Sequence, residues 1–141
     1  MPALRIEIRD ALIAIVAAAA PEYAGHIVPS KLDKVEKGVA ASVYLAGGSN
    51  EPSAMRGVRT REQLTTVSLF SEAPAGDVEK KLSEQLNDLE KAVEVARLAG
   101  DFGSVTSIYL SAFKVDQDPN SKGKRGELHA VFTATFTESL S

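Results

Sequence analysis

Two kinds of hydrophobic spacing alternate along the chain, and together they predict two helices and four strands. Apolar residues recur at steps of three and four from Leu4 to Ala19, which predicts a helix that Pro21 ends. The same spacing from Val78 to Val93 predicts a second helix, with Asp77 as its N-cap. Residues 39–45, 60–71, 105–115 and 128–136 are rich in β-branched and apolar residues, and they predict the strands.

The order of these elements is helix, strand, strand, helix, strand, strand. It predicts a single α+β domain over residues 1–141, with a four-stranded, mostly antiparallel sheet and both helices packed on one face. Residues 21–38 contain prolines and glycines and look like a loop, with a short strand or turn near His26–Val28.

Two polar segments, Gly47–Gly57 and Asp116–Gly126, are dense in Gly, Ser, Asn and Pro, and we expect them to be long loops. Each carries or adjoins a basic group. Partner contacts are often placed on projecting loops, so these cations are the candidate contact residues: Arg56, Arg59 and Arg61 in the first group, and Lys122, Lys124 and Arg125 in the second. The strand end near Arg59 is polar on both faces, and we expect it to project beyond the core.

Composition narrows the classes of function. The 141 residues carry a net charge of −3 and contain no cysteine, which excludes disulfides, thiolate metal sites and cysteine nucleophiles. A nucleic-acid surface needs a clustered basic stripe, which this balance does not support. The apolar run Leu12–Ala20 is too short to span a bilayer, and the acids before it favour a buried helix over a signal peptide.

Catalytic chemistry has no signature in the sequence. The two histidines, His26 and His129, lie far apart and lack metal-ligand spacing, so His129 is interpreted as an ordinary strand histidine. Asp116 and Asp118 alternate at a strand end, where a solvated turn is favoured over a weak divalent-cation site. The sequence therefore predicts no enzyme activity, no cofactor and no metal.

Several segments resemble the tail-terminator proteins of long-tailed bacteriophages, the family of the lambda minor tail protein U. The resemblance lies in the N-terminal helix ALRIEIRDALIAIV, the strand VAASVYLAGG before a polar loop, and the strand REQLTTVSLFSEAPAGD that runs into the second helix. It continues in the closing pair SVTSIYLSAFKVDQD and GELHAVFTATFTES, and it covers nearly the whole chain except Glu22–Gly38.

The resemblance implies a structural virion protein that forms a ring of six copies. Such a ring caps the tail tube, ends its polymerisation and joins the tail to the head-completion (neck) protein, while DNA only passes through the lumen. It implies location in the virion tail after assembly in the bacterial cytoplasm, and no membrane partner. Two alternatives stay open: another phage head–tail joining or tail-completion protein, and a small ligand-binding regulatory domain.

Overall fold

The computed structural model describes residues 4–32, 38–52, 58–74, 76–103, 105–117 and 124–139. Its helices are α1 (Leu4–Ala19), the short 3-10 helix η1 (Pro21–Tyr23) and α2 (Val78–Leu98). Its strands are β1 (Ile27–Val28), β2 (Ala40–Pro52), β3 (Val58–Glu72), β4 (Ser107–Gln117) and β5 (Arg125–Ser139).

The sheet is mixed and has five strands in the order β1-β2-β3-β5-β4. The predicted four-stranded, mostly antiparallel sheet is therefore wrong, although the α+β class is right. The added strand is β1, whose two residues pair in parallel with Ala41 and Ser42 of β2. This strand has only two residues, and Gly25, in the left-handed region, and Pro29 lie on either side of it. Two residues are too few to show a strand period, so the pattern could not separate this strand from a turn.

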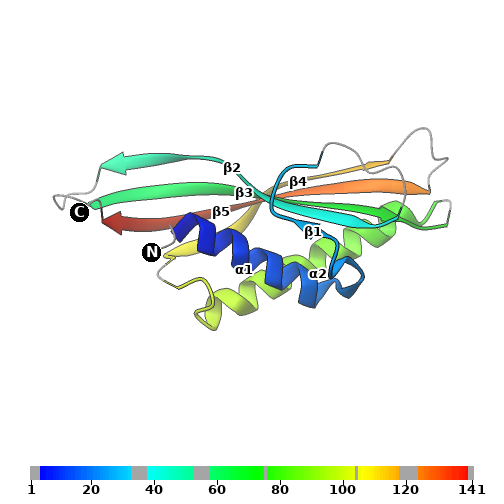
Figure 1. Cartoon of the computed structure of the whole chain (residues 1–141), viewed down its shortest axis with the longest axis horizontal. Coiled ribbons are helices and arrows are strands. Elements are labelled where there is room, and N and C mark those ends of the chain that lie inside the picture. The colour runs from blue at the N-terminus through cyan, green and yellow to red at the C-terminus, as the bar shows by residue number, and fades with distance from the viewer. Residues whose placement is uncertain are drawn as a thin grey trace.

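Both helices lie on one side of the sheet, as predicted (Figure 1). The buried apolar core lies between the helices and the sheet. The predicted helical stripes are confirmed by burial of Ile8, Leu12 and Val16 in α1, and of Leu82, Leu86, Leu89 and Val93 in α2. Alternate residues of β5 meet them, again as predicted, namely Leu128, Ala130, Phe132, Ala134 and Phe136. Burying a large apolar side chain of this kind contributes roughly 1.5–3 kcal/mol, so this layer is the main source of stability.

The hairpin of β2 and β3 extends further than the sequence predicted. Residues 47–52 belong to β2 and pair with residues 59–64 of β3, so the predicted loop over Gly47–Pro52 is wrong; residues 53–57 lie outside the described part. A bulge between Leu45 and Gly47 lets the strand continue, and Gly47 adopts a φ of 140° there. The ends of β2, β3 and β5 reach past the start of α1 (Figure 1), so the predicted projection beyond the core is present.

A second bulge, between Leu110 and Ala112, changes the alternation of β4. The simple period places Phe113 opposite the face of Ile108, but the bulge pairs Phe113 with Ala130, on the helix side of the sheet. Tyr109 pairs with Thr133 on the other side. Phe113 is 62% exposed and Tyr109 is 54% exposed, so the same edge strand presents an aromatic ring on each face.

Candidate assembly surfaces

The first predicted basic group lies at the projecting end of the sheet. Arg59 and Arg61 are both on β3, in the alternation that faces the helix side, and the guanidinium of Arg59 donates to the carbonyl oxygen of Val58 over 3.2 Å. Arg61 lines an open hollow of about 310 Å³ together with Arg5 of α1, which the sequence pattern did not connect to this group. Arg56 lies outside the described residues.

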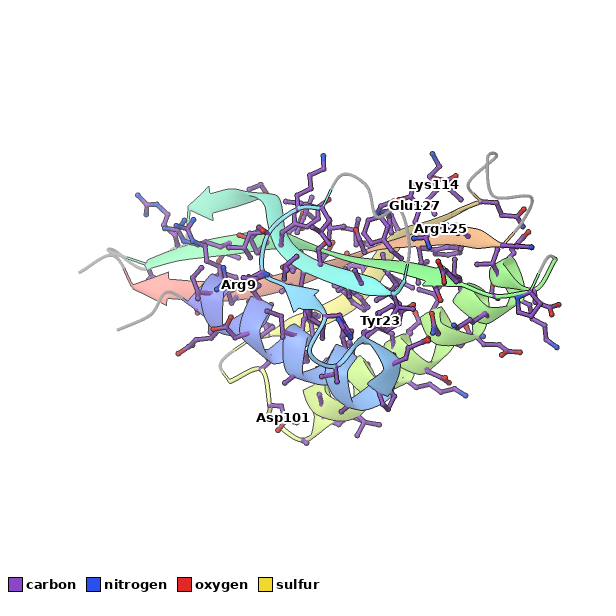
Figure 2. The ribbon with its side chains drawn as sticks, turned by 45° about the vertical axis from the view of Figure 1, so that its right-hand side comes forward. Arg9, Tyr23, Asp101, Lys114, Arg125 and Glu127 are labelled. Atoms are coloured by element: carbon purple, nitrogen blue, oxygen red, sulfur yellow. The ribbon has the colours of Figure 1, made fainter. Side chains whose placement is uncertain are left out.

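The two described residues of the second basic group, Lys124 and Arg125, differ in their surroundings. The guanidinium of Arg125 forms an ion pair with the carboxylate of Glu72, and only 14% of the Arg125 side chain is exposed. The same carboxylate accepts a hydrogen bond of 2.9 Å from the backbone N–H of Gly38, so Arg125 and Glu72 fasten the segment that enters β2. Lys124 is exposed, whereas Lys122 lies outside the described residues. Figure 2 shows Arg125 near Lys114 and Glu127, at one end of the sheet.

The sheet has two open edges of different character. Within the described ranges, no strand pairs with the outer side of β4, and none covers β2 beyond Ser42. An open edge strand presents unpaired backbone N–H and C=O groups that can pair with another chain. The β4 edge adds the exposed rings of Tyr109 and Phe113, while the β2 edge contains the glycine pair Gly47 and Gly48.

A further apolar surface lies on the helical layer. Val95 and Leu98 near the end of α2 are 67% and 72% exposed. Val95 also lines a shallow hollow of about 400 Å³ between the helices. Most of the residues that line it are apolar, among them Ile15, Ala18, Ala19 and Ala92. Within the described residues, neither helix is long and apolar enough to cross a membrane.

The buried residue Tyr23 stabilises the fold and lies beneath these surfaces. Its side chain is fully buried between the sheet and the helices, and its hydroxyl donates to Oε1 of Gln85 over 2.9 Å. Burial raises the pKa of Tyr23 to about 12, so the phenol stays neutral at physiological pH. Lys81 of α2 also forms an ion pair of 3.0 Å with Glu22, which fixes η1 against the helix.

Comparison with solved structures finds chains of similar fold. No family model matches the chain, and no curated protein matches its sequence. Among solved structures, the fold is similar to a chain described as "Virion of native gene transfer agent (GTA) particle". The TM-score is 0.51 and the sequence identity is 11%, and the match covers 92% of this chain and 94% of the other. The two chains therefore share a fold over almost their full lengths.

Proposed function

We propose that this chain is a structural protein of a phage-like particle, and that copies of it form a ring that caps the tail tube. The observation that carries the proposal is the shared fold with a virion chain, because it extends over almost all of both chains. The resemblance of the sequence segments to tail terminators supports the finer assignment to tube capping. In this proposal the ring has six copies, and its two faces contact the tail-tube protein and the neck protein.

The open edges of the sheet support assembly into a ring. A closed ring is built from heterologous contacts, in which one surface of each copy meets a different surface of the next. The β4 edge and the uncovered part of β2 lie on opposite sides of one sheet, so they meet this requirement. The exposed rings of Tyr109 and Phe113 add apolar area to the backbone groups of β4.

The projecting end of β2 and β3 is the proposed contact with the tube. Arg59 and Arg61 lie there, and Arg5 of α1 lines the same hollow as Arg61. Positive side chains at the rim of an interface mainly steer association and select partners. Their removal should therefore affect docking more than folding.

Electron microscopy of tail tubes tests the proposal. Tail-tube subunits of the same particle are polymerised with and without this protein, and tube lengths are measured. We expect tubes that stop growing when the protein is present. Tubes that grow to the same indefinite length would contradict capping, and binding to the neck protein with unchanged tube length would favour the alternative of another head–tail joining protein.

Charge variants locate the contact in the same assay. Replacing Arg56, Arg59 and Arg61 with alanine should leave the melting temperature nearly unchanged and abolish capping. The matched control removes three exposed cations elsewhere, in Lys31, Lys80 and Lys91, and it should cap normally. A large fall in melting temperature for the arginine variant would show that these side chains support the fold instead.

A further inference from the structure

Three metal-ligating side chains come together on the face of the sheet opposite the helices. Asp116 of β4 pairs with Glu127 of β5, and His129 lies two residues further along β5 on the same face. One donor atom from each of Asp116, Glu127 and His129 lies within 4.8 Å of the others, and we name these residues the DEH cluster. Because antiparallel pairing sets their spacing, the positions do not depend on loop conformation.

The imidazole of His129 is oriented by residues outside this cluster. Its Nδ1 lies 2.8 Å from the hydroxyl oxygen of Ser68, a residue that is only 1% exposed. The ring of Phe70 meets it edge-on, with ring centroids 6.1 Å apart. Metal-binding histidines commonly use one ring nitrogen for a hydrogen bond to a neighbouring group, here Ser68, and this bond leaves the other nitrogen aimed at the metal.

The other nitrogen, Nε2, faces the carboxylates at a separation that suits a shared ion. It lies 3.4 Å from Oε2 of Glu127, which is longer than an ordinary N–H···O hydrogen bond. Two ligand atoms on one tetrahedral zinc ion, each about 2.1 Å from the metal, are about 3.4 Å apart. The side chains of the cluster are between 33% and 39% exposed, so an ion from solvent can reach them.

We propose that Asp116, Glu127 and His129 bind a divalent transition-metal ion of the zinc type, with solvent as the remaining ligand. An imidazole nitrogen with two carboxylate oxygens suits zinc, whereas magnesium and calcium prefer all-oxygen sites. This site is independent of the capping proposal. The sequence raised Asp116 only with Asp118, as a disfavoured cation site, and it did not connect Asp116 to His129, because the two belong to different strands that only the β4–β5 register brings together.

Lys114 competes with the metal in this arrangement. Its ammonium lies 3.4 Å from Oδ2 of Asp116 and pairs with it only loosely, and 73% of its side chain is exposed. A bound cation at Asp116 repels this ammonium, so the lysine side chain swings into solvent when the ion binds. Removing the lysine charge should therefore strengthen metal binding.

Titration calorimetry of the full chain, after removal of metal by a chelator, tests the site. Zinc chloride should bind with one ion per chain, and His129→Ala should weaken binding roughly tenfold or more. His26→Ala is the matched control, since His26 is the other histidine and is exposed, and it should bind as the parent chain does. Lys114→Ala should bind zinc more tightly than the parent chain.

Other outcomes overturn the proposal. Absence of saturable zinc binding, or equal losses in His26→Ala and His129→Ala, would exclude the site. Magnesium binding as strong as zinc binding and insensitive to His129→Ala would indicate only ions loosely attracted to surface carboxylates. Thermal melting of each variant without metal establishes that the variant is folded, and zinc should raise the melting temperature only where the cluster is intact.

Discussion

A substitution at Gly48 can distinguish the observed projecting strand from the loop that the sequence predicted for the same residues. A Cβ atom added at this position would lie 2.2 Å from the backbone carbonyl oxygen of Glu62 and 3.3 Å from Cα of Gln63. The first distance is over 1 Å short of the roughly 3.5 Å of an ordinary van der Waals contact. Because the obstacle is backbone, β2 and β3 must move apart to admit the methyl group. Overpacking of this kind costs about 1–3 kcal/mol, so Gly48→Ala should lower the free energy of unfolding by that amount.

Urea unfolding measures this loss, and amide hydrogen exchange locates it. The midpoint should fall with little change in slope, and exchange should quicken in residues 47–52 and in the partner residues of β3. Ser49→Ala is the control, because Ser49 is exposed in the same strand. A loss below about 0.5 kcal/mol with unchanged exchange would refute the close pairing and restore the loop interpretation.

Three further changes test other parts of the structure. Leu86→Ala should cost about 2–5 kcal/mol in chemical unfolding, since Leu86 is only 7% exposed, and a loss well under 1 kcal/mol would place that face in solvent. The folded chain holds the Tyr23 phenol proton more tightly than the unfolded chain, so its contribution is complete below pH 10 and falls as pH rises from 10 to about 12. Tyr23→Phe should flatten that decline, and Tyr109→Phe, at an exposed site, should not. Phe113→Lys should leave the melting temperature within a few degrees but prevent tube capping. Leu98→Lys, at another exposed apolar residue, should cap normally, and the reverse result would move the interface to the helical layer.

The periodic parts of the fold were predictable because they bury one face. The stripe of Ile8, Leu12 and Val16 and the alternation of Leu128–Phe136 follow directly from helical and strand periods. The extension of β2 to Pro52 was missed because its residues are mostly glycine and polar, and no alternation of apolar residues marks them as a strand. Glycine there permits a bulge and a close backbone approach, a use that composition does not distinguish from a flexible loop.

The candidate surfaces were only partly predictable for a similar reason. The sequence located Arg59 and Arg61 correctly near a projecting strand end, but Arg5 joins them only through the packing of α1 on the sheet. Arg125 looked like part of an exposed basic loop, yet its pairing with Glu72 depends on the β3–β5 register. The bulge in β4 that exposes Phe113 on the helix side leaves no mark in the sequence, because one extra residue alters the alternation without changing composition.

Cryo-electron microscopy of the tube end most directly tests the proposal that this chain is a ring-forming cap. Tail tubes assembled with the protein should end in a closed ring of this chain, six copies in our proposal, with β4 of each copy against its neighbour. Bare tube ends, or copies whose β4 edge faces only solvent, would contradict it.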